Sequence, residues 1–246
     1  MALAMRGDLQ WFFSMCSGYA GKLAGPLLTE KQRGDDPSLS GEAQRTLRVL
    51  LSILHNASPR DVHILAQPAK PVLVYSDASF EANTLRLGWV IFAGDQQPFG
   101  GSCLIPDEEI AKWKARRQQI FPGESLCGLI IPFFHIEQLA QCDVVWFVDN
   151  CAAVAALVKC SSTEADVHTI VQHSHWLLHR AGVRVWYEWI DSKSNLSDGL
   201  SRLGIQDPWT AKQNWVVFDY PFPDSLRVNS FLDALEASLE SEQWVY

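Results

Sequence analysis

This sequence contains no run of about 18 uninterrupted apolar residues, the length that a membrane-spanning helix needs. Its first residues, MALAMRGDLQWFF, include the charged Asp8 and lack an apolar core that leads to a small-residue cleavage site. We therefore expect no membrane span, no secretory signal peptide and no membrane partner.

The six cysteines show no CxxC pair and no Cys/His spacing of a zinc site. Several lie in apolar segments, as reduced core cysteines do, so we expect an intracellular protein, cytoplasmic or nuclear. Positive charge is also scarce, because 20 basic residues face 28 acidic ones and the net charge is −8. This balance argues against a nucleic-acid partner held mainly by bulk charge, although a basic local face or a metal-binding acidic cluster is compatible with it.

The chain does have enough apolar material for a core, since 48% of its 246 residues are hydrophobic. We expect residues 1–66 to be helical and loop-rich, because residues 40–57 carry a helical stripe of apolar positions. Three prolines then mark a boundary near 67–71. Residues 71–202 are predicted to form an α/β domain, and residues 203–246 a Trp-rich tail that ends in a helix.

Hydrophobic periodicity within 71–202 alternates between short β-branched runs and helical stripes. Three strands with hairpin-length links are followed by strands that helices connect. This order predicts a mixed sheet of five strands flanked by helices, in which the first and fourth strands are parallel neighbours. The predicted strands are 72–79, 85–94, 98–105, 143–149 and 183–191, and the predicted helices are 106–119, 121–140, 150–158, 163–182 and 194–202.

Four acidic residues fall at matching points of this architecture. Asp77 and Asp149 end the first and fourth strands, Glu124 begins the helix that must cross the sheet, and Asp198 lies in the last short helix. The carboxyl ends of parallel strands share one edge, where ligands of open α/β sheets bind, so we expect the four side chains to converge there. Carboxylates about 4 Å apart repel by about 4 kcal/mol per pair at an effective dielectric near 20. Such a cluster needs cations or protons, and Mg²⁺ in pairs would suit an in-line phosphodiester displacement.

Each acid taken alone also has a structural explanation. An Asp at a strand end is commonly a turn residue or a helix cap, and a Glu in a first helical turn suits the helix dipole. The functional interpretation depends on all four acids meeting at one place.

The motifs VYSDAS, PGESL, FVDNCAAV and SNLSDGLSR together resemble a ribonuclease H domain across residues 71–202. The whole string is most similar to the domain that follows reverse transcriptase in DIRS-type retrotransposons. This resemblance implies a ribonuclease H-like fold with strand order 3-2-1-4-5 and an Mg²⁺-dependent (or Mn²⁺-dependent) endonuclease that cuts the RNA strand of RNA–DNA hybrids. Asp77, Glu124, Asp149 and Asp198 would be its catalytic, metal-binding residues. Residues 1–66 would resemble the end of a truncated polymerase, and no polymerase activity is expected because no YxDD-like motif is present.

Substrate contacts are predicted from the same motifs and from the densest basic run, KWKARRQQ. Lys193 stands about where related domains often carry a mobile His, and Asn150 is as consistent with a helix cap as with a substrate contact. The basic run fits either a phosphate-tracking strip or a solvated helix face paired with nearby acids. The predicted substrate-binding residues are Ser79, Lys112, Lys114, Arg116, Arg117, Asn150, Lys193, Asn195 and Arg202.

Two alternatives remain open at this point. The chain fits a catalytically degenerate fragment of the same fold that binds nucleic acid or a protein, because the His is missing and the net charge is acidic. Other nucleases of the same broad fold fit less well, since the order of acids along this chain is Asp, Glu, Asp, Asp.

Overall fold

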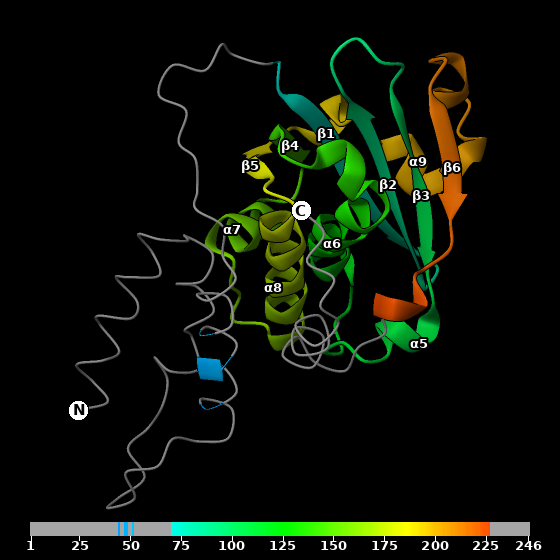
Figure 1. Ribbon diagram of the computed structural model, residues 1–246. Coiled ribbons are helices and arrows are strands. Elements are labelled where there is room, and N and C mark those ends of the chain that lie inside the picture. The colour runs from blue at the N-terminus through cyan, green and yellow to red at the C-terminus, as the bar shows by residue number, and fades with distance from the viewer. Residues whose placement is uncertain (1–43, 45–46, 49–50, 52–69, 227–246) are drawn as a thin grey trace, which may run out of the picture. The chain divides into compact units, whose positions relative to one another are not determined.

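The computed structural model describes residues 70–226 together with residues 44, 47, 48 and 51 (Figure 1). Those four residues are helical and fall inside the predicted helix 40–57. The rest of that helix and the predicted C-terminal helix lie outside the described residues. Within the described part, no helix is both long enough and apolar enough to cross a membrane.

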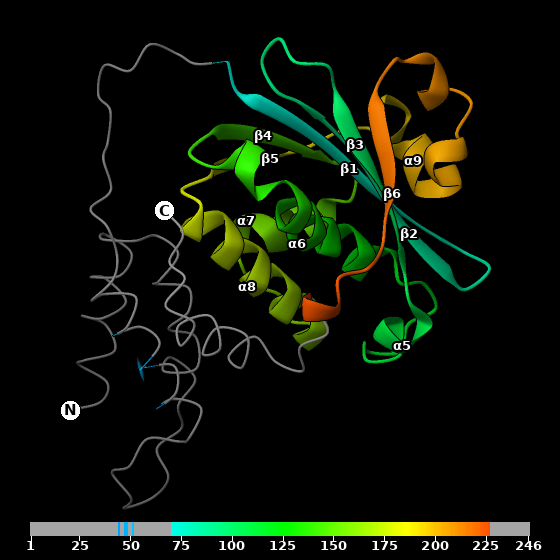
Figure 2. The ribbon, with the colours of Figure 1, turned by 45° about the vertical axis from the view of Figure 1, so that its right-hand side comes forward.

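The predicted order of the five strands is confirmed. The sheet runs β5-β4-β1-β2-β3-β6, with β1–β2 and β2–β3 antiparallel and β1–β4 and β4–β5 parallel (Figures 1 and 2). The five-strand part has the ribonuclease H-like topology that the motifs imply. Its strands are β1 (Val72–Glu81), β2 (Thr84–Phe92), β3 (Phe99–Ile105), β4 (Asp143–Val148) and β5 (Arg184–Trp189).

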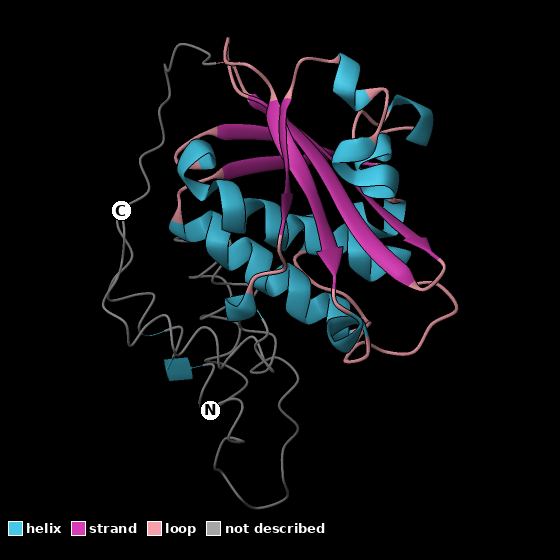
Figure 3. Ribbon diagram, turned by 90° about the vertical axis from the view of Figure 1, so that its right-hand side faces the viewer, coloured by secondary structure: helices cyan, strands magenta, loops and turns pink. Residues whose placement is uncertain are grey.

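Helices lie on both faces of the sheet (Figure 3). One face is covered by α6 (Ile120–Leu139), α7 (Cys151–Lys159) and α8 (Ala165–Arg180), and the other carries α9 (Asp198–Leu203). The core between the sheet and α6 contains the fully buried Trp89 and Trp146. Pro132 lies inside α6, and His135 has non-helical backbone angles that kink the helix.

A sixth strand, β6 (Val216–Tyr220), was not predicted. It pairs with β3 in parallel, so part of the segment read as a Trp-rich tail belongs to the sheet. Gly101 on β3 makes this possible, because a Cβ there would lie 2.2 Å from the carbonyl oxygen of Phe218. The pairing joins distant segments, and the sequence between them gives no signal of its register.

The predicted polar helix 106–119 is wrong over most of its length. Only α5 (Asp107–Ile110) is helical, and the chain then turns toward the start of α8. The amide of Lys114 donates to Oδ2 of Asp166 at 2.9 Å, and the Arg116 guanidinium binds both oxygens of that carboxylate at 2.6 and 2.7 Å. These contacts to a residue about 50 positions away outweigh the local helical preference of the segment.

Candidate metal centre

Asp77 emerges where the parallel part of the sheet ends. The pairing of β1 with β4 stops at Ser76 and Val148, whereas β1 continues beside β2 as far as Glu81. Asp77 therefore does not end its strand, contrary to the prediction, but it is the first residue of β1 beyond the end of β4. Asp149 follows β4 directly, so both acids lie at the carboxyl edge of the parallel strands.

Glu124 comes from the first turns of α6 and is 1% exposed. Its Oε1 accepts a hydrogen bond from the amide of Ala78, the residue after Asp77, at 3.0 Å. Gly123 permits the close packing of the helix on the sheet, because a Cβ there would lie 2.8 Å from a methyl carbon of Leu85. The helix start is thus held directly against the strand that carries Asp77.

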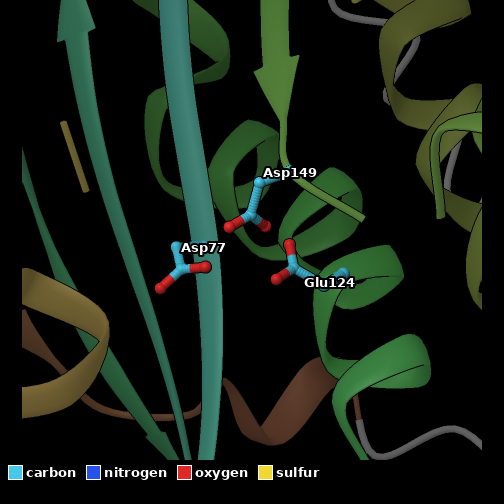
Figure 4. Close-up of side chains that lie close together, drawn as sticks. All are labelled: Asp77, Glu124 and Asp149. Atoms are coloured by element: carbon cyan, nitrogen blue, oxygen red, sulfur yellow. The ribbon is translucent and has the colours of Figure 1, made fainter. Parts of the chain in front are cut away.

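These three carboxylates converge. One oxygen each of Asp77, Glu124 and Asp149 lies within 4.8 Å of the other two, and Figure 4 shows the three side chains pointing toward one another from β1, α6 and the end of β4. The side chains of Asp77 and Glu124 are buried, and that of Asp149 is half-buried. The arrangement matches the predicted convergence for three of the four acids.

The electrostatics of the three carboxylates favour uptake of protons or cations. Burial, together with the charges of Asp149 and Asp198, raises the pKa of Asp77 to about 6, against a hydrogen bond from Ser201 that lowers it. Burial and the charges of Asp77 and Asp149 raise the pKa of Glu124 well above its usual value. Oε2 of Glu124 is buried and has no hydrogen-bond partner among the described residues, which leaves it available to a ligand.

Asp198 does not join the three. It begins α9, and its Oδ1 accepts a hydrogen bond from Nε of Arg202 at 2.9 Å. Its charge still contributes to the raised pKa of Asp77, so it lies within electrostatic range of the cluster. The prediction of four converging carboxylates is therefore met by three, with the fourth nearby in an ion pair.

Helix α9 is tied to β1 by residues that the motif predicted as substrate contacts. The Ser79 hydroxyl donates to the carbonyl of Ser201 at 2.6 Å, and Nδ2 of Asn195 donates to the carbonyl of Ser76 at 2.9 Å. Both side chains are buried, so in this structure they position α9. The Ser201 hydroxyl in turn donates to Oδ2 of Asp77. The sequence analysis did not predict this contact, although Ser201 lies in the motif SNLSDGLSR.

Gly88 on β2 allows this packing. A Cβ at Gly88 would lie 2.3 Å from the amide nitrogen of Ser201, which real structures do not accommodate without a backbone shift. A glycine inside a strand commonly marks such a close approach, so this position carried a signal that the sequence interpretation did not use.

The Asn150 side chain caps α7. Its Oδ1 accepts hydrogen bonds from the amides of Ala152 and Ala153 at 3.0 and 3.1 Å. The cap was one of the two predicted roles, and the carboxamide oxygen is engaged in it.

Most of the basic run is paired with acids. Lys112 lies 2.7 Å from Glu109, Lys114 lies 2.8 Å from Glu164, and Arg116 binds Glu164 and Asp166. Arg117 and Lys193 are exposed and make no hydrogen bond or ion pair with the described residues. Among the predicted cationic contacts, Arg117 and Lys193 are therefore the two without an ion pair in the described part of the chain.

A tryptophan beside the cluster was not predicted as part of the site. Nε1 of Trp189, at the end of β5, donates to the carbonyl of Asp149 at 3.1 Å. The side chain is 49% exposed, so it contacts both solvent and the backbone that carries one of the carboxylates.

Comparison with known proteins gives matches among solved structures alone. No family model matches the chain, and no curated protein matches it. RNase H1 from the halophilic archaeon Halobacterium salinarum is 17% identical and matches 50% of this chain and 88% of its own, with a TM-score of 0.40. An N-terminal RNase H domain from Mycobacterium tuberculosis, solved as a fusion with maltose-binding protein, is 14% identical and matches 50% of this chain and 84% of its own, with a TM-score of 0.36.

Proposed function

We propose that this chain is a divalent-metal-dependent endonuclease that hydrolyses the RNA strand of RNA–DNA hybrids. The observation that carries the proposal is the convergence of Asp77, Glu124 and Asp149 within 4.8 Å at the carboxyl edge of the parallel strands. The order of acids along the chain and the motifs around them support the ribonuclease H class over other nucleases of related fold.

The residues present fit a hard divalent cation. All three side chains offer carboxylate oxygens, which Mg²⁺ and Mn²⁺ prefer, and Oε2 of Glu124 is a buried oxygen without a partner among the described residues. A bound cation would supply an activated water and stabilise charge on the leaving oxygen of the phosphodiester. The chain's own part is to hold Asp77 on β1, Asp149 after β4 and Glu124 on α6 with their carboxylates together, and to place Arg117 and Lys193 at the surface for phosphates.

The test is a cleavage assay with end-labelled RNA–DNA hybrid in Mg²⁺, beside duplex DNA and duplex RNA of the same sequence. The expected result is Mg²⁺-dependent cutting of the RNA strand of the hybrid alone, lost in Asp149→Asn. Asp143→Asn is the matched control, because Asp143 lies exposed at the opposite end of the same strand. Equal cutting by wild type and Asp149→Asn, or cutting of duplex DNA in preference to hybrid, would rule the proposal out.

A second candidate is a fragment of the same fold that binds nucleic acid or a protein without cutting. The engagement of Asp198 by Arg202 and the pairing of most of the basic run favour it. Calorimetric titration with Mg²⁺ separates the two, since absence of binding at millimolar Mg²⁺ supports the non-catalytic function.

We also propose that the chain derives from a DIRS-type retroelement, in which it would accompany a polymerase remnant and lack polymerase activity. The motif string from VYSDAS to SNLSDGLSR supports this origin. The domain limits 1–66, 71–202 and 203–246 and the intracellular location remain predictions of the sequence.

A further inference from the structure

Arg202 bridges two carboxylates at the edge of the candidate metal centre. Its Nε lies 2.9 Å from Oδ1 of Asp198, one helical turn earlier on α9, and its Nη1 lies 2.8 Å from Oε1 of Glu81 at the end of β1. One planar guanidinium therefore joins the helix that carries the fourth acid to the strand that carries Asp77. The hydrogen bond with Asp198, together with the charges of Asp198, Asp77 and Glu81, raises the pKa of Arg202, so its guanidinium lies within electrostatic range of the cluster.

This bridge competes with any cation for Asp198. The positive charge of Arg202 beside Oδ1 repels a divalent ion and neutralises part of the carboxylate charge that would attract it, so the ion pair lowers the affinity of Asp198 for a cation. The other three acids are free of such a partner, because no Lys, Arg or His in the described part forms an ion pair with Asp77, Glu124 or Asp149. Three of the acids therefore have no cationic side chain competing with a metal ion, whereas the fourth, Asp198, is paired with Arg202.

The bridge is built to exchange partners. Side-chain exposures of 52% for Arg202, 40% for Asp198 and 66% for Glu81 make both ion pairs solvent-accessible, and exposed pairs contribute little stability. A guanidinium also matches a phosphate in a two-point contact at least as well as a carboxylate. A phosphate that arrives at the metal centre therefore offers Arg202 an alternative partner at small cost.

We propose that Arg202 is a substrate-operated latch on Asp198, an inference that rests on the proposed nuclease function. Without nucleic acid, Arg202 retains Asp198 and the protein binds one cation at Asp77, Glu124 and Asp149. When a backbone phosphate of the hybrid takes over Arg202, Asp198 is released and a second cation binds. Hybrid and second cation then strengthen each other's binding by the same factor, as linkage requires.

The experiment is calorimetric titration of the full chain with Ca²⁺, an oxygen-seeking ion of less strict geometry than Mg²⁺, with and without a short RNA–DNA hybrid. Wild type is expected to bind one ion alone and two with hybrid, and the hybrid should tighten binding of the second ion by about fivefold, the most that an exposed ion pair supplies. Arg202→Gln should bind two ions without hybrid and lose this coupling. Arg202→Lys keeps the positive charge but loses the planar guanidinium that binds two oxygens at once. Its coupling between hybrid and second ion should therefore lie between those of wild type and Arg202→Gln.

Arg184→Gln is the matched control for loss of one positive charge. Arg184 pairs with Asp143 at the far end of the parallel strands, in an exposed Arg–Asp contact like that of Arg202 with Asp198. This variant should bind ions as wild type does. If Arg184→Gln changes the affinity for the second ion as much as Arg202→Gln does, the effect comes from the loss of a positive charge in general, and the latch is excluded.

Failure of the latch and failure of the proposed function are distinguishable. If wild type binds no ion at any concentration tested, with or without hybrid, the metal centre itself is wrong and both proposals fall. If wild type binds one ion and cuts hybrid in Mg²⁺, yet Arg202→Gln shows unchanged stoichiometry and coupling, the nuclease stands and the latch alone is refuted.

Discussion

The amide of Ala78 donates a hydrogen bond to Oε1 of Glu124 at 3.0 Å, across 46 residues of sequence. This bond joins the strand residue next to Asp77 to the first turns of α6, so two of the three converging carboxylates are held by one contact. Oε2 of Glu124 remains without a partner among the described residues, although the side chain is 1% exposed. A buried acid with one satisfied and one unsatisfied oxygen is destabilising alone and is relieved by a cation.

Glu124→Gln is therefore expected to stabilise the metal-free protein. The amide keeps an acceptor for Ala78 and removes a buried ionisable group whose pKa is raised by burial and by its acidic neighbours. The gain should be on the order of 1 kcal/mol, or about 3 °C in Tm for a domain of this size. Thermal unfolding in EDTA checks it.

In Mg²⁺ the ranking should reverse, because the cation stabilises the wild type and binds the variant weakly. Asp143→Asn serves as the control and should follow the wild type in both conditions. A variant that loses stability in EDTA would show that Glu124 is a structural acid and not a metal ligand.

Acid stability should depend on His135. Nε1 of Trp89 donates to Nε2 of His135 at 3.0 Å inside the core, and burial lowers the pKa of His135 from 6.5 to about 4. Between pH 6.5 and about 4, the imidazole of His135 is protonated in the unfolded chain but neutral in the folded protein. The free energy of unfolding should therefore fall as pH drops from 6.5 to 4, by up to about 1.4 kcal/mol per pH unit from this group.

Urea unfolding at pH 7.5, 6.0, 5.0 and 4.5 measures this dependence, with His135→Gln as the variant that lacks it. At each pH, the free energy of unfolding of His135→Gln is subtracted from that of wild type. This subtraction is needed because protonation of Asp77 changes the stability of both proteins in the opposite direction. Its pKa is raised to about 6, so its folded form takes up a proton first and gains stability as pH falls from 6 toward 3.8. A difference that is flat across the series would mean that His135 does not titrate as its burial implies.

The strand order and the positions of the acids were predictable because the signals are local. Short β-branched runs, hairpin-length links and an acid after Val148 or Ser76 can be read from neighbouring residues, and the rules of sheet connection then bring Asp77 and Asp149 together. The same reasoning predicted Glu124 as a member of the cluster, since a helix that crosses the sheet must begin near that edge, and the structure places it there.

What the sequence did not predict depends on long-range contacts. The segment after α5 looks helical alone, but Arg116 and Lys114 bind acids at the start of α8, about 50 residues later. The retention of Asp198 by Arg202 is also invisible, because the i, i+4 spacing predicts an ion pair and not whether a metal site competes for it.

Trp189 is expected to support the metal centre through the backbone. Trp189→Phe keeps an aromatic ring but removes the donor to the carbonyl of Asp149, so the carboxylate that follows β4 should be held less rigidly. Affinity for Mg²⁺ should fall by about tenfold, as loss of an outer contact to a metal ligand commonly does, while Tm changes by only a few degrees.

Trp186→Phe is the matched control. Trp186 lies on the same strand, is more exposed at 67%, and donates to Glu188 instead. Calorimetric titration with Mg²⁺ should therefore leave this variant at wild-type affinity. Equal losses in the two variants would assign the effect to the strand as a whole and not to the bond with Asp149.

Arg116 is expected to contribute to stability more than to nucleic-acid binding, contrary to its predicted place in a phosphate-tracking strip. Its side chain is 16% exposed and that of Asp166 is 10% exposed, and two hydrogen bonds join them. Burial opposes ionisation of Asp166, but the bonds from Arg116 and from two backbone amides outweigh it and lower the pKa of Asp166. Arg116→Gln leaves this acid short of partners and should cost about 1–3 kcal/mol in the free energy of unfolding.

Lys70→Gln supplies the contrast, because Lys70 and Asp95 form an ion pair with side-chain exposures of 77% and 93%. Its loss should cost less than about 0.5 kcal/mol. Urea unfolding compares the two variants, and binding of a fluorescent hybrid in Ca²⁺ is measured beside it. A variant of Arg116 that unfolds like wild type but binds hybrid more weakly would restore the phosphate-contact role. A stability loss with unchanged binding of the folded protein would assign Arg116 to holding the segment that leads into α6 and Glu124.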